Sequence, residues 1–82
     1  MKVKELMEHL SQADPEALVV LSRDSEGNSY QEVWAIETNM TFIERDAEAY
    51  YRELTPEMIE EGWVEDDIRP NGPLAVVLWP GG

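Results

Sequence analysis

The chain has 82 residues, no cysteine, and a formal net charge of −12 from 18 acidic and six basic residues. We expect residues 1–82 to form a single domain with a small core, and the lack of cysteine excludes disulfides, thiolate zinc ligands and thiol catalysis. Because nucleic-acid binding depends on Lys and Arg neutralising phosphates, the charge argues against direct contact with DNA or RNA. The same charge favours a protein partner with a basic surface.

Membrane and secretion signals are not evident in the sequence. Residues 1–6 include two lysines but lead into alternating polar residues, unlike the apolar run of a secretion signal. The longest apolar runs, residues 17–21 and 74–79, are far shorter than the roughly 20 residues of a membrane span. We therefore expect a cytoplasmic protein with no membrane partner.

The first predicted element is an amphipathic helix over about residues 2–13. Its apolar residues recur at the i, i+3, i+4, i+7 spacing of one helix face: Val3, Leu6, Met7 and Leu10. Pro15 ends this helix, because the residue before a proline is displaced from the helical region. The single histidine, His9, falls on the polar face, and no serine has the surroundings of a catalytic nucleophile.

A β-hairpin is predicted next. Residues 17–21 are aliphatic and continuous, which favours a strand covered on both faces. Gly27 and Asn28 then provide a turn, and alternation from Tyr30 onwards predicts a second, antiparallel strand. We expect a turn or bulge at Asn39, followed by a third strand over residues 40–44.

The second half of the chain is rich in acids, since residues 44–67 hold ten of the eighteen. Thr55, Pro56 and Glu57 form a strong helix start, with Thr as N-cap, Pro at the first position and Glu in the first turn. Gly62 ends this helix, with Met58 and Ile59 expected to face inward, and residues 64–68 predict one further turn. Residues 74–79 read as a final buried strand, which we expect to pair beside residues 17–22.

These elements predict an α+β fold. It consists of a small, mostly antiparallel sheet of three or four strands, an N-terminal amphipathic helix packed on one face, and a short acidic helix near residues 55–68. Because the core is small and apolar strand surface is plentiful, this fold favours a homodimer over a monomer.

Several short motifs are spread over nearly the whole chain, except about residues 31–51. They are Val3-Lys4-Glu5-Leu6, Asp14-Pro15, Val19-Val20-Leu21-Ser22, Asp24-Ser25-Glu26-Gly27-Asn28-Ser29-Tyr30, Leu54-Thr55-Pro56-Glu57, Glu61-Gly62-Trp63, Glu65-Asp66-Asp67 and Val76-Val77-Leu78-Trp79-Pro80. Together they resemble a group of small phage and prophage proteins. The resemblance implies a location in the host cell cytoplasm, and because the group is uncharacterised it assigns no catalytic role to any residue. Two positions depart from the group: Lys2 stands where we expect a capping Thr or Ser, and Val64 where we expect Thr.

No arrangement of residues predicts an enzyme, a cofactor or a metal site. The turn that begins at Asp24 has Gly at its fourth position, whereas a calcium-binding EF-hand loop requires Gly at the sixth and Glu at the twelfth. The glycines are isolated, so no phosphate-binding loop is present. Paired carboxylates for acid and base catalysis need a cleft that separates their pKa values, which so small a domain rarely forms.

The acid-rich helix and the turn after it are the candidate binding site. The predicted partner-binding residues, named here the acidic segment, are Glu57, Glu60, Glu61, Trp63, Glu65, Asp66 and Asp67. Their glutamates recur at about one helical turn and form a negative ridge that suits a basic partner. The alternative is a solvated face that keeps the protein in solution. Trp63 is either a plug over the core or an anchor of the interface.

The sequence thus favours a non-enzymatic, anti-CRISPR-like phage accessory protein that inhibits a host defence complex at a basic nucleic-acid-binding surface. Two alternatives remain open at this point. One is a small-ligand or cation-binding module that uses residues 24–30, and the other is a structural or assembly component of a phage particle.

Overall fold

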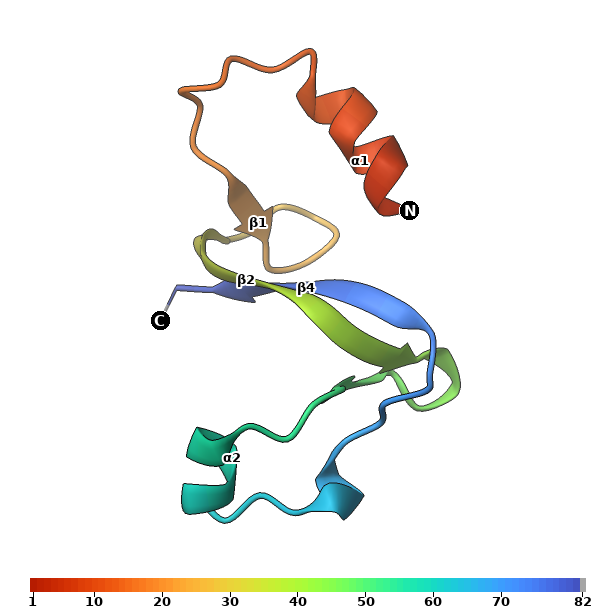
Figure 1. Ribbon diagram of the computed structural model, residues 1–82. Helices are drawn as coiled ribbons and strands as arrows, with labels where there is room; N and C mark the ends of the chain where they lie inside the picture. The colour runs from red at the N-terminus through yellow and green to blue at the C-terminus, as the bar shows by residue number, and fades with distance from the viewer. Residues whose placement is uncertain (82) are drawn as a thin grey trace. The chain divides into compact units, whose positions relative to one another are not determined.

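The computed structural model describes residues 1–81 (Figure 1). Helices and strands follow one another in this order: α1 (Val3–Leu10), β1 (Val20–Ser22), β2 (Tyr30–Ile43), η1 (Glu44–Asp46), β3 (Glu48–Tyr51), α2 (Pro56–Glu60), η2 (Glu65–Asp67) and β4 (Leu74–Pro80). Elements η1 and η2 are single turns of 3₁₀ helix. The predicted α+β class, with its N-terminal helix and short acidic helix, is confirmed.

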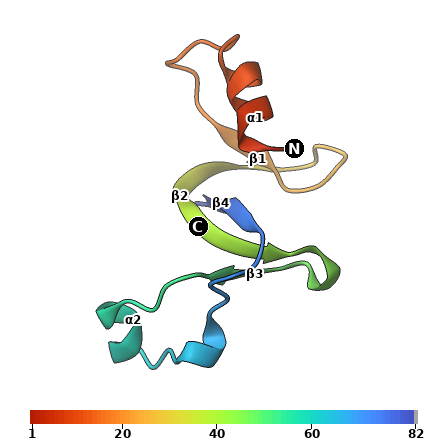
Figure 2. The ribbon, with the colours of Figure 1, turned by 45° about the vertical axis from the view of Figure 1, so that its right-hand side comes forward.

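Strand β2 is the central strand of a four-stranded antiparallel sheet (Figure 2). It pairs with β1, with Leu21 opposite Gln31, and with β3, with Thr41 opposite Tyr50. Strand β4 also pairs with β2 and not with β1, so the predicted partner of residues 74–79 is wrong. The hairpin between β1 and β2 is confirmed, and β1 is a short edge strand of three residues.

The predicted break at Asn39 is also wrong. Strand β2 runs without interruption through Asn39 to Ile43, so the expected second and third strands are one strand of 14 residues. The actual third strand is β3, which follows η1 and a left-handed backbone conformation at Ala47 (φ 53°). Strand β2 is paired with neighbouring strands, and this pairing holds Asn39 in an extended conformation although Asn favours turns.

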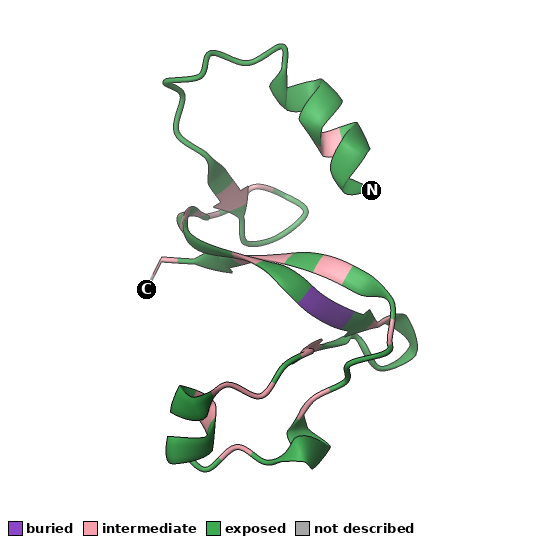
Figure 3. Ribbon diagram, viewed as in Figure 1, coloured by how far each residue is buried: buried purple, intermediate pink, exposed green. Residues whose placement is uncertain are grey.

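The described chain divides into two compact units, one of residues 1–35 and 78–81 and the other Ile36–Val77. In the first unit, called here the N-terminal unit, no residue is buried (Figure 3). In the second, called the central unit, Met40 and Thr41 are 2% and 0% exposed. Because neighbouring strand residues point to opposite faces, both faces of β2 are covered at this point.

Several predicted burials are not observed. Leu18, Val19 and Val20 are 78%, 54% and 49% exposed, so the first strand is not covered on both faces. In β4, Leu74 is 67% exposed, and in α2 Ile59 faces solvent while Met58 is half-buried. The apolar character of these residues predicts a core position, but apolar character alone does not specify what covers them.

Helix α1 is shorter than predicted and does not pack its apolar face. It ends at Leu10, and residues 11–13 continue as hydrogen-bonded turns. At its start, the Glu5 carboxylate accepts a 3.4 Å bond from the Lys2 amide, while the Lys2 side chain has no oxygen to accept in return. No helix within residues 1–81 has the length and apolar character to cross a membrane.

Candidate functional site

The acidic segment begins on α2, in the central unit. The Thr55 hydroxyl accepts a hydrogen bond from the Met58 amide at 3.2 Å, and Pro56 occupies the first helical position, so the predicted helix start is confirmed. Helix α2 has five residues and carries Glu57 and Glu60, both exposed. Glu57 lies in the first turn, where a carboxylate interacts favourably with the free amide groups.

Gly62 ends α2 in a Schellman motif. The Trp63 amide donates to the Met58 carbonyl at 3.0 Å, and the Gly62 amide donates to the Ile59 carbonyl at 3.1 Å. The φ of Gly62 is 101°, a left-handed conformation that residues with a side chain rarely adopt. The chain therefore reverses at Gly62 and directs Trp63 back toward the sheet.

Trp63 packs on the sheet by an aromatic contact. Its ring meets that of Tyr51 on β3 edge to face, with ring centroids 5.5 Å apart and planes at 82°. This is a favoured geometry for aromatic pairs. Trp63 is half-buried, so it packs against β3 and still keeps part of its surface accessible.

The remaining acids lie on η2. The Asp67 carboxylate accepts from the Val64 amide at 2.8 Å, which is one half of a capping box. Val64 has no side-chain oxygen for the other half. Glu65, Asp66 and Asp67 are all exposed, but they belong to a separate turn from α2, so the expected single ridge is divided into two groups of carboxylates.

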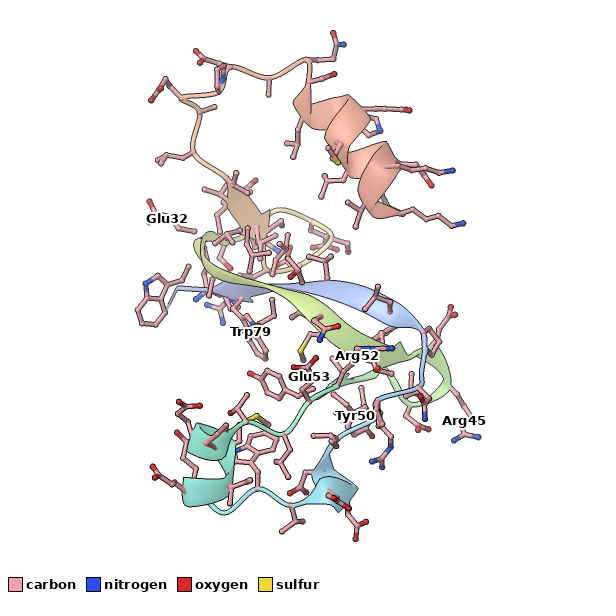
Figure 4. The ribbon with its side chains drawn as sticks, in the orientation of Figure 1. Glu32, Arg45, Tyr50, Arg52, Glu53 and Trp79 are labelled. Atoms are coloured by element: carbon pink, nitrogen blue, oxygen red, sulfur yellow. The ribbon has the colours of Figure 1, made fainter. Side chains whose placement is uncertain are left out.

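A cluster of buried polar groups fixes the chain that carries these acids. The side chain of Arg52 is labelled in Figure 4. Its Nη1 donates to the hydroxyl of Thr41 at 2.9 Å and to the carbonyl of Gly72 at 2.7 Å. The same Thr41 hydroxyl donates to the carbonyl of Arg69 at 2.6 Å. Residues 52 and 72 bracket the acidic segment, so these bonds hold both of its ends against β2.

Arg69 adds a second set of contacts beside the acidic segment. Its amide donates to the carbonyl of Tyr51 at 2.9 Å, and its guanidinium lies 4.6 Å from the centroid of the Tyr50 ring. Its Nη1 also donates to the carbonyls of Asp66 and Ile68, each at 2.8 Å. Tyr50 and Tyr51 are both half-buried.

The carboxylates of the acidic segment are not neutralised by neighbouring cations. Within residues 1–81 the one ion pair is Arg45 with Asp46, at 3.2 Å, between exposed side chains outside the acidic segment. Arg52 and Arg69 bind carbonyl and hydroxyl oxygens and no carboxylate. The negative charge of the segment therefore remains available to an external cation.

The acidic segment also borders a shallow, open hollow of about 290 Å³. Glu61, Gly62, Trp63 and Asp67 line it. Two carboxylates next to an aromatic ring suit a guanidinium or ammonium group, which gains both charge-assisted hydrogen bonds and contact with the ring. The hollow joins the two groups of carboxylates, one from the end of α2 and one from η2.

The loop that begins at Asp24 has a structural role. Asp24 Oδ1 accepts from the amides of Glu26 at 2.9 Å and Asn28 at 3.2 Å, and Gly27 has a φ of 73°. The bond from the Asn28 amide is the main reason that the pKa of Asp24 lies below its ordinary value, because it stabilises the charged form. No three acidic or histidine side chains in the described part of the chain are grouped to hold a metal ion.

The residues that position the acidic segment were not identified from the sequence. In the sequence, Thr41 is one residue of a predicted strand with alternating polarity. Arg52 and Arg69 are isolated basic residues in an acid-rich stretch. Their long-range partners lie 11 to 28 residues away, and three of the four acceptors in these bonds are backbone carbonyls. The one available signal was the presence of arginine within a stretch otherwise dominated by acids.

These features define a small acidic α+β protein whose group of unpaired carboxylates lies between two ends fixed by hydrogen bonds. Comparisons with protein-family models, curated proteins and solved structures found no match. The assignment of a function therefore depends on the site itself.

Proposed function

We propose that this chain is a non-enzymatic, phage-type accessory protein that binds a protein partner through the acidic segment. The partner presents a basic surface, and the surface that best fits this description is the nucleic-acid-binding site of a host defence complex. The observation that carries the proposal is the exposure of six carboxylates, from Glu57 to Asp67, with no cation paired to them in residues 1–81.

The contacts that hold the acidic segment support binding. The bonds from Arg52 and Thr41 fix its two ends, and the contact of Trp63 with Tyr51 fixes its middle. A surface that is ordered before binding loses less conformational entropy when a partner arrives. A set of carboxylates that served only to keep the protein in solution would not need this arrangement.

The hollow beside Trp63 supports a basic side chain as the central contact. An arginine or lysine of the partner placed there meets Glu61 and Asp67 together with the aromatic ring. The surrounding carboxylates then interact with further bases and raise the association rate. The chain carries a net charge of −12, so a polyanion such as DNA is repelled from the same surface.

The experiment that tests the proposal is capture of a partner from host lysate by the immobilised full-length chain at low salt. The test variant carries Glu57→Gln, Glu60→Gln and Glu61→Gln, and the matched control carries Glu5→Gln, Glu8→Gln and Glu16→Gln. Both remove three exposed charges, but only the first alters the acidic segment. We expect the wild type and the control to retain the same basic protein, and the test variant to lose it.

The proposal is wrong if no protein is retained, or if the two triple variants behave alike. If both triple variants lose the partner equally, binding depends on the net charge of the chain and not on where the carboxylates lie. The acidic segment would then not be the binding site. A far-ultraviolet circular dichroism spectrum of each variant establishes that the fold is kept.

A further inference from the structure

The turn before β4 contains the dipeptide Asn71-Gly72, which lies between η2 and β4 in the central unit. Asn71 is exposed. The side-chain carboxamide carbon of an asparagine can reach the backbone nitrogen of the next residue and close a five-membered ring with it. A following glycine has no Cβ to obstruct that approach. Asn71 therefore lies where an asparagine side chain can react with its own main chain.

No hydrogen bond holds the two groups that would react. Within residues 1–81, the Asn71 carboxamide has no hydrogen-bond partner and the Gly72 amide donates to no acceptor. The bond that fixes this turn is made by the Gly72 carbonyl, which accepts from Arg52 Nη1 at 2.7 Å. The carboxamide of Asn71 and the amide nitrogen of Gly72 can therefore approach one another without first losing a hydrogen bond.

The other two asparagines of the chain are held in place. The amide of Asn28 donates to Asp24 Oδ1 at 3.2 Å, and its Nδ2 donates to Glu26 Oε2 at 3.4 Å. Asn39 lies within β2, and the next residue, Met40, is 2% exposed. Both asparagines are also followed by a residue with a side chain. Ring closure is therefore obstructed at these two positions and open at Asn71.

We propose that Asn71 is the site of spontaneous deamidation in this chain, and that the isoaspartyl product releases the C-terminal end of the acidic segment from β2. The Gly72 nitrogen attacks the carboxamide carbon of Asn71 and forms a C–N bond, while Nδ2 leaves as ammonia with the proton of the Gly72 amide. Water, the one co-reactant, then opens the cyclic imide at either of its carbonyl groups.

The two openings give different main chains. Opening at the side-chain carbonyl gives aspartate, and opening at the main-chain carbonyl gives isoaspartate. In isoaspartate the main chain continues through the former side chain and is longer by one methylene group. In both cases an amide and water have become a carboxylate and ammonium, so the chain gains one negative charge and no electron is transferred.

The additional methylene group falls at a closely packed point. A Cβ placed on Gly72 collides with Cγ2 of Thr41, so the main chain at Gly72 already lies against that side chain. Arg52 Nη1 bonds to the Gly72 carbonyl and to the Thr41 hydroxyl at the same time. A longer main chain immediately before Gly72 displaces the carbonyl from this position, because a packed site has no free space to absorb the extra atoms. Arg52 then no longer reaches both acceptors.

The first experiment is peptide mapping by mass spectrometry of the full chain stored in neutral buffer at physiological temperature. Cleavage after arginine separates Asn71 from Asn28 and Asn39, because Arg45 and Arg52 lie between them. We expect Asn71 to deamidate roughly tenfold faster than either other asparagine, since only its neighbour lacks a Cβ. Deamidation that occurs first at Asn28 or Asn39, or an Asn71 that stays intact over weeks, overturns the proposal.

The second experiment measures whether the longer main chain loosens the fold. The isoaspartyl form, purified by chromatography, is compared in urea denaturation with Asn71→Asp, which adds the same charge without the methylene group. We expect the unfolding midpoint of the isoaspartyl form to fall and that of Asn71→Asp to match the fresh wild type. Asn71→Gln, stored in the same way, controls for other chemical damage, because its longer side chain disfavours ring closure.

Equal midpoints for the isoaspartyl form and the fresh chain overturn the proposal. So does an equal loss in the isoaspartyl form and Asn71→Asp, because charge and not main-chain length would then be the cause. Neither experiment involves a partner, so the outcome is independent of the proposed function.

Discussion

Arg52 and Thr41 form the contact that connects the acidic segment to the sheet. Arg52 Nη1 lies 2.9 Å from the Thr41 hydroxyl and 2.7 Å from the Gly72 carbonyl, and Thr41 is 0% exposed. The pairing is notable because an arginine from an acid-rich stretch of the sequence binds neutral oxygens and no carboxylate. The arrangement leaves the carboxylates of the acidic segment unpaired and attaches both ends of the segment to β2.

Replacing Arg52 with Ala should destabilise the chain by about 1–3 kcal/mol, since two part-buried acceptors lose their donor. Urea denaturation monitored by circular dichroism measures the effect. Arg45→Ala is the matched control, because Arg45 is 86% exposed and its ion pair with Asp46 lies at the surface. Its effect should stay within about 0.5 kcal/mol. Equal effects of the two substitutions would contradict a structural role for Arg52.

Replacing Gly72 with Ala should also destabilise the fold. A Cβ at this position collides with the Cγ2 atom of Thr41, which is held by its own hydrogen bonds. The expected cost is about 1–3 kcal/mol. At Gly81, a Cβ meets its nearest atom at an ordinary 3.6 Å, so Gly81→Ala should be nearly neutral. A Gly72→Ala chain as stable as the wild type in urea would show that the contact at Thr41 relaxes freely.

Replacing Val64 with Thr should stabilise the acidic segment. The Asp67 carboxylate already accepts from the Val64 amide, and the Asp67 amide donates to the Val64 carbonyl at 3.0 Å. A hydroxyl at position 64 gives this amide a second acceptor and supplies the missing half of the capping box. Val64 is 55% exposed, so the exchange of a methyl group for a hydroxyl buries no new polar atom. The gain should be about 0.5–1 kcal/mol in urea denaturation. Val64→Ala serves as the control, and a Thr variant no more stable than Ala would exclude the cap.

The Asp24 loop should make stability depend on pH. Because the folded-state pKa of Asp24 is lowered, mainly by the bond from the Asn28 amide, its stabilising effect is present above the ordinary aspartate pKa and is lost as pH falls through the folded value. Carboxyl NMR titration should show Asp24 protonating below the range of an unperturbed aspartate. Asp24→Asn keeps an acceptor oxygen and removes this pH dependence, while Asp24→Ala also loses the turn. An unshifted Asp24 titration would contradict the hydrogen bonds.

Local features of the fold could be predicted from the sequence where neighbouring residues determine them. The cap at Thr55, the left-handed end at Gly62 and the turn at Gly27 each depend on one or two adjacent residues. The corresponding helix end and hairpin are confirmed. A conformational preference that depends on a few neighbouring residues can be recognised from the sequence alone.

Long-range relationships could not be predicted in the same way. The pairing of β4 with β2 and the bonds of Arg52 join residues that are far apart in the sequence. The continuation of β2 through Asn39 depends on pairing with strands that are distant in the sequence. The seven residues of the acidic segment, identified from composition, all lie in the central unit. It did not reveal that two arginines hold the segment without neutralising it.

The most direct test of the proposed function is competition between the chain and nucleic acid for the captured partner. Fluorescence anisotropy of a labelled oligonucleotide bound to that partner is measured as the chain is added, at constant ionic strength. We predict that the wild-type chain displaces the oligonucleotide, and that the chain carrying Glu57→Gln, Glu60→Gln and Glu61→Gln does so at least tenfold less effectively. An oligonucleotide that stays bound while the partner also binds the wild-type chain would contradict the proposal that the acidic segment covers a nucleic-acid-binding surface.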